Sequence, residues 1–171
     1  MSAGAVHVYT GDGKGKTTAA VGLAVRAAGA GLRVLIVHFL KGLPASEHAA
    51  LEKIPGITIR SFGRKGFIRG APSPRDRAEA AHALHALEHS LASGGFHLVV
   101  ADELVTALSL DLVAEADVLD LLAKRPPGAE VVLTGRGATR ALVRAADLVT
   151  EMKNRKHYYA RGRKAKKGIE Y

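Results

Sequence analysis

Short runs of apolar residues recur along the chain, separated by segments that carry polar and helix-forming residues. Each run has the length of a buried β-strand, and the first of them stops abruptly at Gly11. We predict strands over residues 6–10, 33–40, 57–62, 96–101, 130–134 and 147–151, and one more near residues 156–160. Helices are predicted between them, over residues 16–30, 74–93, 104–122 and 139–145.

Strands that alternate with helices in this way predict an α/β fold with a mainly parallel sheet and helices on both of its faces. No internal repeat, low-complexity tract or linker divides the sequence, so we expect a single domain over residues 1–171. In such sheets, ligands bind beyond the carboxyl ends of the strands. The segments in which to search for a site are therefore residues 10–17, 41–47, 63–70, 102–106 and 134–138.

Composition narrows the class of protein. The sequence contains no cysteine, which excludes disulfides, a thiol nucleophile and thiolate metal ligands and fits a reducing compartment. No apolar stretch approaches the roughly 20 residues that a membrane-spanning helix needs, and no charged start followed by an apolar run marks a signal peptide. We therefore expect a cytoplasmic protein without a membrane partner.

Positive charge is concentrated near the end of the sequence. The formal net charge is +9, and residues 152–167 include no acidic residue. This basic tail, about residues 152–171, is either a solvated segment or a surface for an anion such as a nucleotide or a nucleic acid. Charge alone slightly favours the solvated segment.

The segment after the first predicted strand has the features of a phosphate-binding loop. Its glycines allow backbone N–H groups to surround phosphate oxygens, and the helix that follows adds the positive end of its dipole. Lys16 supplies a mobile cation, and Thr17 places a hydroxyl where it can bind Mg²⁺. The usual pattern begins with glycine where this chain has Thr10, and Lys14 adds a further cation. Motif and context together favour a phosphate site over a plain glycine turn.

Two acidic residues follow the fourth predicted strand. In phosphate-loop proteins, a carboxylate at this strand end approaches the magnesium ion. The alternative is that Asp102 caps the next helix, with Glu103 as a first-turn acid. The phosphate loop favours the metal interpretation. Because the two residues are adjacent, we expect only one of them to reach the metal, directly or through water.

Other polar residues carry weaker signals. Arg136 follows the fifth predicted strand, and its spacing fits a surface arginine and a phosphate or sugar contact equally well. Arg26 lies late in the first helix, where most arginines are solvated. His82, His85 and His89 share one face of a predicted helix. A solvated or partner-facing stripe is a better explanation of these histidines than a metal site.

Together these motifs resemble the ATP:corrinoid (cob(I)alamin) adenosyltransferases of the phosphate-loop type. The similar segments are residues 10–20, 26–29, 37–42, 102–104, 134–137, 147–152, 156–157 and 168–171. The resemblance implies a P-loop NTPase-like, three-layer αβα domain that forms a homodimer. It implies transfer of the 5′-deoxyadenosyl group of ATP to the Co(I) of reduced cobalamin or a precursor corrinoid, with release of triphosphate, in adenosylcobalamin biosynthesis or salvage. An electron-donating reductase is an implied partner.

The resemblance also implies roles for matching positions. Lys16 and Glu103 are the expected catalytic residues, and Thr17 and Glu103 the expected ligands of Mg²⁺, the implied cofactor. Phe67 and Arg69 are expected to face the corrinoid. The expected ATP contacts are Gly11, Asp12, Gly13, Lys14, Gly15, Lys16, Thr17, Thr18, Arg26 and Arg136, with His157 as a weaker candidate. In this family ATP lies reversed relative to other phosphate-loop enzymes, so that the loop holds the far phosphates and the ribose faces the corrinoid.

The sequence departs from the family pattern at several points. Asp12 stands where asparagine is common. Phe67 matches the first member of an aromatic pair that displaces the lower ligand of cobalt, but Arg69 stands near the second, which puts that step in question. The first strand begins at once, without the segment that caps the site in some relatives. We therefore expect a more open site, or one that the basic tail covers.

Two other functions fit the phosphate loop considered alone. An ATPase or kinase would release ADP and orthophosphate, but no clear residue for orienting an attacking water is found. A nucleotide-regulated module could bind nucleic acid through the basic tail and would show strongly salt-dependent affinity. The tail lacks the interleaved aromatic residues of a stacking platform apart from Tyr158 and Tyr159, so nucleic acid is not an expected partner.

Overall fold

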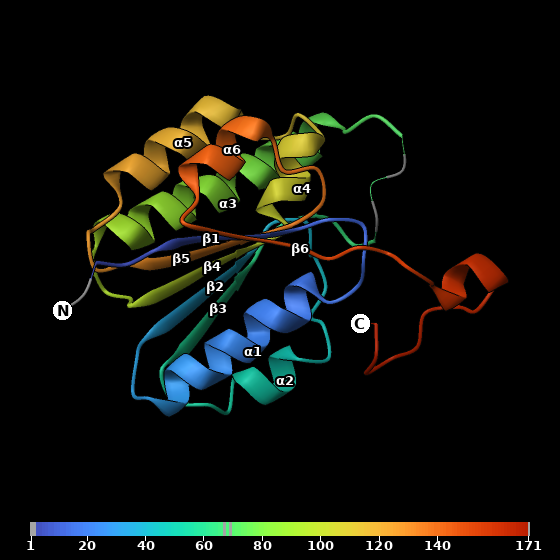
Figure 1. The fold of residues 1–171 in the computed structure, drawn as a ribbon, viewed down its shortest axis with the longest axis horizontal. Coiled ribbons are helices and arrows are strands. Elements are labelled where there is room, and N and C mark those ends of the chain that lie inside the picture. Colours follow the sequence, from blue (N-terminus) through green and yellow to red (C-terminus); the bar gives the residue numbers. More distant parts are fainter. Residues whose placement is uncertain (1–2, 67, 69, 171) are drawn as a thin grey trace.

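The computed structural model describes residues 3–66, 68 and 70–170. Its centre is a six-stranded parallel sheet with the strand order β3-β2-β4-β5-β1-β6 (Figure 1). The strands are β1 (Val6–Thr10), β2 (Val34–His38), β3 (Ile57–Ser61), β4 (Leu98–Asp102), β5 (Glu130–Thr134) and β6 (Leu148–Glu151). The six strands predicted between residues 6 and 151 are thus confirmed, with small differences at their ends.

Helices cover both faces of this sheet. Helices α1 (Lys16–Gly29) and α2 (His48–Leu51) lie on one face. The other face carries α3 (Pro74–Ala92), α4 (Leu104–Ser109), α5 (Glu115–Lys124) and α6 (Arg140–Ala145) (Figure 1). Two separate apolar clusters fill the spaces between the layers. The predicted three-layer α/β architecture is therefore confirmed.

The burial of the strands explains the apolar runs in the sequence. All five residues of β2 and all five of β4 are buried, because helices pack on both faces of these central strands. Strand β6 lies at the edge, and its four residues are exposed. None of the described helices is long and apolar enough to cross a membrane.

Two predicted elements differ from the structure. The helix predicted over residues 104–122 is divided into α4 and α5, because Asp111 adopts a left-handed conformation with φ 53° and a turn separates the two helices there. The strand predicted near residues 156–160 is wrong. That segment forms the 3₁₀ helix η1 (Tyr158–Arg161), in which the His157 side chain accepts a hydrogen bond from the backbone of Tyr159. The short helix α2 was not predicted.

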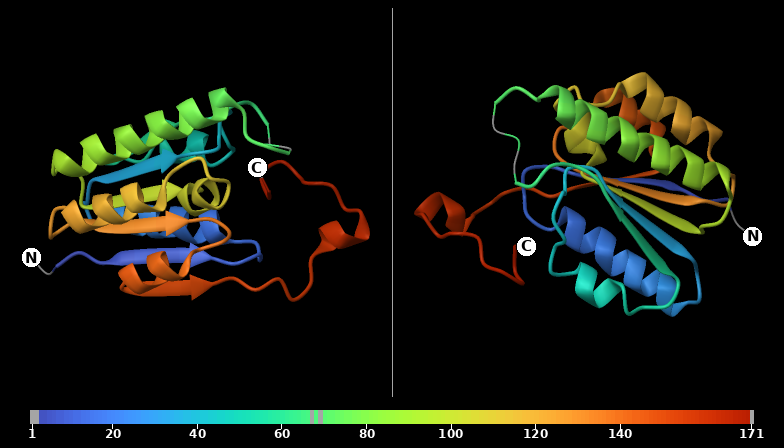
Figure 2. Two further views of the ribbon diagram at one scale, coloured as in Figure 1. Left: turned by 90° about the horizontal axis from the view of Figure 1, so that it is seen from above. Right: turned by 180° about the vertical axis from the view of Figure 1, so that it is seen from behind.

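Parallel strands bring their carboxyl ends to one edge of the sheet, which positions the site. His38 at the end of β2 pairs in register with Asp102 at the end of β4, and Tyr9 pairs with Thr134 at the end of β5. Figure 2 shows the chain after β6 passing outward beyond this edge and then turning back. The loop before α1, the polar strand ends and the basic tail therefore lie on the same side of the molecule.

Candidate active site

The predicted phosphate loop joins β1 to α1 and makes a tight turn. Gly11 and Gly15 adopt φ angles of 95° and 120°, which only glycine adopts at low cost. The backbone of Met152, just after β6, passes so close that a Cβ on Gly11 would lie 2.5 Å from its carbonyl oxygen. The N–H of Gly13 donates to that same carbonyl at 2.6 Å. These glycines are needed both for the turn and for the approach of the following chain.

Lys16 begins α1 and is buried, with 8% of its surface exposed. Its Nζ donates to the carbonyl oxygens of Gly11 and Gly13, at 2.7 and 2.8 Å. Burial and the nearby Arg136 guanidinium lower the pKa of Lys16, while Glu103 acts in the opposite direction. The structure therefore brings three of the predicted site residues, Lys16, Glu103 and Arg136, into one electrostatic environment.

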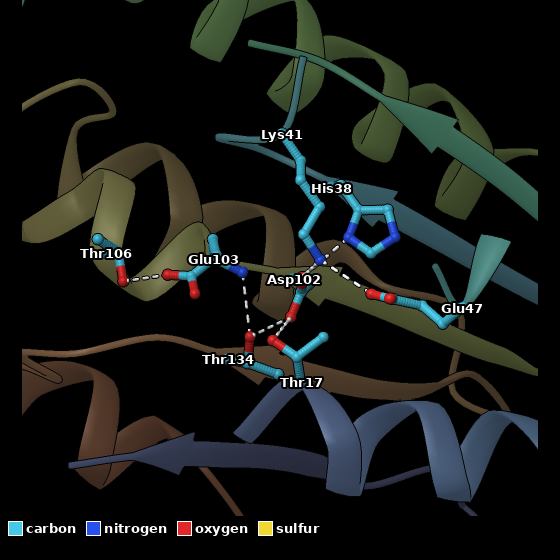
Figure 3. Close-up of polar contacts among 8 residues, drawn as sticks. All are labelled: Thr17, His38, Lys41, Glu47, Asp102, Glu103, Thr106 and Thr134. Atoms are coloured by element: carbon cyan, nitrogen blue, oxygen red, sulfur yellow. Dashed lines mark hydrogen bonds and ion pairs between the residues drawn. The ribbon is translucent and has the colours of Figure 1, made fainter. Parts of the chain in front are cut away.

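Asp102 is the centre of a polar cluster at the carboxyl edge (Figure 3). Its Oδ1 accepts hydrogen bonds from the hydroxyls of Thr17 and Thr134, at 2.8 and 2.7 Å. Its Oδ2 lies 2.8 Å from Nδ1 of His38 and 3.3 Å from Nζ of Lys41. Burial by itself raises the pKa of this carboxyl, but the hydrogen bond from His38 and the charge of Lys41 outweigh it and hold the pKa well below its usual range.

These hydrogen bonds determine what Asp102 can do. A carboxylate has about four lone-pair positions, and the hydrogen bonds to Asp102 occupy them with four separate donors. Asp102 is thus saturated and orients its neighbours. Because the Thr17 hydroxyl donates its hydrogen to Asp102, its oxygen lone pairs remain available to a cation. The alternative that Asp102 caps the next helix is wrong, since Glu103 occupies the N-cap position.

Glu103 has a backbone conformation that is rare for its residue type. Its φ is 63°, a left-handed value that costs a non-glycine residue on the order of 1 kcal/mol. Two contacts hold it: its N–H donates to the hydroxyl of Thr134 at 3.0 Å, and its carboxylate accepts from Thr106 at 2.5 Å (Figure 3). Thr134 therefore links Glu103 to Asp102, so that the two candidate metal ligands, Thr17 and Glu103, are oriented through one carboxylate.

His38 and Lys41 are members of this cluster that the sequence motifs did not indicate. His38 is fully buried, and its ring stacks on that of His48 with 4.7 Å between the centroids. Lys41 bridges Asp102 and Glu47, and these two acids raise the pKa of Lys41 against the effect of its burial. The available signal was the position of His38 and Lys41 at the carboxyl end of an apolar strand, in a segment that also resembles the adenosyltransferases.

Several predicted ATP contacts lie exposed around the loop. Asp12 and Thr18 are exposed, as is Arg136, whose backbone N–H donates to Thr106 at 3.0 Å. Arg26 lies in the last turn of α1. It is ten residues from Lys16, or about 15 Å along the helix axis, so α1 does not bring it beside the loop. Its role in binding ATP stays a prediction.

Lys14 is engaged by the basic tail. Its Nζ donates to the Glu170 carboxylate and to the Ile169 carbonyl, each at 2.8 Å, and to the Tyr158 hydroxyl at 3.2 Å. Tyr158 also donates to Glu170. The end of the tail is thus fastened to the side of the phosphate loop, whereas the sequence left open whether it covers the site.

The remaining candidates lie elsewhere or outside the described residues. His82, His85 and His89 are exposed along α3. Among the described residues, no group of three or more histidines, aspartates and glutamates is placed to hold a metal ion. The role of the histidine stripe stays a prediction. The residues predicted to face the corrinoid, Phe67 and Arg69, lie outside the described residues.

Comparison with known proteins reveals one family. The family model described as ATP:corrinoid adenosyltransferase BtuR/CobO/CobP matches residues 2–171. The corrinoid adenosyltransferase of Pseudomonas aeruginosa is 38% identical over 170 residues, which cover 98% of this chain and 84% of that protein. That of Escherichia coli K12 is 36% identical over 170 residues, or 98% and 86%. Corrinoid adenosyltransferase CobA of Salmonella typhimurium is 37% identical over 172 residues, with the same coverage.

Proposed function

This chain belongs to the ATP:corrinoid adenosyltransferases, and we propose that its phosphate loop and Asp102 cluster hold the triphosphate of ATP and a magnesium ion during the transfer. The reaction is the ATP-dependent adenosylation of a corrinoid. The electron pair of Co(I) forms the bond to the 5′ carbon of the ribose, the bond from that carbon to oxygen breaks, and triphosphate leaves. No nucleophilic side chain is required.

The protein's tasks are then to position ATP and to stabilise a leaving group that gains negative charge. Lys16 is suited to this, because burial and Arg136 make its charged form costly until an anion arrives. Binding of a phosphate would replace the contacts of Lys16 with the carbonyls of Gly11 and Gly13 by stronger charge-assisted hydrogen bonds. We assign Lys16 the role of stabilising the departing triphosphate.

The donor set fits magnesium. Mg²⁺ prefers oxygen ligands and usually takes one or two from the protein, with water and phosphate oxygens as the rest. Thr17 offers a hydroxyl oxygen whose hydrogen is directed to Asp102, and Glu103 offers a carboxylate at the adjacent strand end. The ion would supply positive charge to the phosphate oxygens. The observation that carries this proposal is the hydrogen bond from Thr17 to the saturated, buried Asp102.

Manganese in place of magnesium tests this assignment, because its electron paramagnetic resonance spectrum reports binding directly. We expect Thr17→Val and Glu103→Gln to weaken Mn²⁺ binding in the ATP complex by about tenfold or more. Thr17→Ser is the matched control, since it keeps the hydroxyl. Wild-type Mn²⁺ affinity in both Thr17→Val and Glu103→Gln would show that the metal lies elsewhere.

Edge strand β6 supports a homodimer. Leu148 and Val149 on this strand and Val143 on α6 are each 41% exposed. An unpaired edge with apolar side chains is a surface that proteins usually cover. We propose that a second copy of this chain covers it. Sedimentation of Val149→Lys should give a lighter particle than wild type, whereas the equally exposed Val25→Lys should not change the mass.

Two further assignments concern the source of the electron that forms Co(I) and the compartment in which the protein works. The sequence contains no cysteine, and its side chains offer no redox centre that could reduce a corrinoid. We propose that a separate reductase delivers the electron and that the protein works in the cytoplasm, where ATP is available. The family relationship does not favour the two alternatives, a phosphate-cleaving ATPase or kinase and a nucleic-acid-binding module.

A further inference from the structure

A basic cavity lies apart from the phosphate loop. Its volume is about 430 Å³, and Arg64, Lys65, Ser73 and Arg75 line it. The first two residues follow β3, and the last two belong to the start of α3. Three of the four lining side chains are cations, so the cavity suits an anionic group.

Asp76 contacts two of the lining residues, Arg64 and Ser73. Asp76 is buried, and its Oδ2 accepts hydrogen bonds from the hydroxyl and backbone N–H of Ser73, at 2.7 and 2.9 Å. These hydrogen bonds, together with the charges of Arg64 and Arg75, lower the pKa of Asp76, which therefore stays ionised. Asp76 forms an ion pair with Arg64 at 3.7 Å, whereas no ion pair of Lys65 or Arg75 is found among the described residues.

Helix α3 adds to the positive potential. It begins at Pro74, directly beside the cavity, and runs for 19 residues. The amino end of a helix of this length carries a partial positive charge. Ser73 and Asp76 form a capping box that fixes the direction of this first turn. The cavity thus combines mobile cationic side chains with a fixed helix end.

The cavity lies at the same edge of the sheet as the phosphate loop. The N–H of Lys41 donates to the Phe62 carbonyl at 2.8 Å, and that of Gly42 donates to the Arg64 carbonyl at 3.2 Å. The loop that carries Arg64 is therefore tied to the segment after β2. Strand β3 stands two positions from β4 in the sheet, about 10 Å from the end that carries Asp102. A ligand the size of a corrinoid can reach both places.

We propose that Lys65 and Arg75, with Arg64 beside them, bind the phosphodiester that joins the corrin to its lower nucleotide in a complete cobalamin. Arginine and lysine are the side chains that recognise phosphate by charge-assisted hydrogen bonds. Cobinamide lacks this phosphodiester and gains nothing from the cavity. The cavity therefore favours phosphate-containing acceptors. This inference rests on the proposed function, because it requires the corrinoid to bind at this edge.

Steady-state kinetics with three Co(I) acceptors test the proposal: cobalamin, cobinamide and cobinamide phosphate, which has the phosphate without the lower base. In the double variant Lys65→Gln/Arg75→Gln we expect KM to rise about tenfold for cobalamin and cobinamide phosphate. We expect no change in KM for cobinamide or for ATP. Lys124→Gln is the control, because it removes an exposed cation that pairs with Asp120 on α5, away from the cavity.

Other outcomes overturn the proposal. An equal rise of KM for all three acceptors would mean that the cavity supports the fold of the site, and a rise for ATP alone would assign the cavity to the nucleotide. Unchanged kinetics would remove any role in binding. Inorganic phosphate provides a second readout: it should compete with cobalamin in the wild type but not in the double variant. A wild-type protein that alkylates none of the acceptors would instead refute the proposed function.

Discussion

The hydroxyl of Thr17 donates to Oδ1 of Asp102 at 2.8 Å, between residues that are 85 positions apart in the sequence. This contact joins the first turn of α1 to the end of β4 and so connects the phosphate loop to the polar cluster. It fixes the direction of the Thr17 oxygen before any ligand binds. Preorganisation of this kind reduces the cost of arranging the site during the reaction.

Asp102→Asn should weaken the response to magnesium. An asparagine keeps the size of the side chain but replaces one oxygen with an N–H₂ donor, which cannot accept from Thr17 or His38. Loss of such an orienting partner costs about 10- to 100-fold in metal affinity or activity. The rate as a function of Mg²⁺ concentration measures the effect. Glu47→Gln, which removes the negative charge of the second partner of Lys41, is expected to change the Mg²⁺ dependence far less. A wild-type Mg²⁺ dependence in Asp102→Asn would refute the orienting role.

Lys16→Ala should lower turnover by about 100-fold or more while the fold is retained. The side chain contacts the loop carbonyls and belongs to neither apolar cluster, so its removal leaves the core packing intact. Loss of one preorganised donor to developing charge costs about 100- to 1,000-fold in kcat. Single-turnover rates measure the loss of activity, and far-ultraviolet circular dichroism checks that the fold is retained. Lys53→Ala, on an exposed lysine, controls for loss of charge. Wild-type turnover in Lys16→Ala would mean that the triphosphate binds elsewhere on the protein.

His38 is expected to act through Asp102. His38→Asn keeps an N–H donor near the position of Nδ1, whereas His38→Leu removes the donor and leaves Oδ2 of Asp102 without this partner. Leaving a buried carboxylate without one of its hydrogen-bond donors costs about 1–3 kcal/mol or more, so His38→Leu should unfold more easily. In the folded protein, we expect His38→Leu to need more Mg²⁺ than the wild type, as Asp102→Asn does. His38→Asn should need nearly as little Mg²⁺ as the wild type. Equal Mg²⁺ requirements in both His38 variants would limit the residue to a structural role.

The contact between Lys14 and Glu170 is expected to hold the tail on the phosphate loop. The tail offers trypsin several cleavage sites, among them Arg161 and Arg163. Glu170→Gln removes the charge that Lys14 contacts, so the tail should be cleaved several times faster than in the wild type. Glu151→Gln, which removes the surface pair with Lys153, is the control. Equal cleavage rates in Glu170→Gln and the wild type would show that this contact does not hold the tail.

Local patterns predicted most of the fold and the phosphate loop. The apolar runs marked the strands because the central strands are buried on both faces, and Gly11 to Thr17 lie consecutively in the sequence. The cluster around Asp102 was only partly predicted, because it depends on which strands become neighbours. His38 and Lys41 meet Asp102 only because β2 pairs with β4. The break between α4 and α5 was missed because Asp111 takes a conformation that its residue type rarely adopts.

In the proposed reaction, the loop from Gly11 to Thr17 binds a triphosphate that departs whole. Anaerobic incubation with ATP, Mg²⁺ and chemically reduced cobalamin tests it, with the phosphorus products followed by ³¹P nuclear magnetic resonance and the corrinoid by its absorption spectrum. We predict a light-sensitive adenosylcorrinoid and inorganic triphosphate in equal amounts. ADP and orthophosphate without an alkylated corrinoid would show that the loop instead serves cleavage at the terminal phosphate.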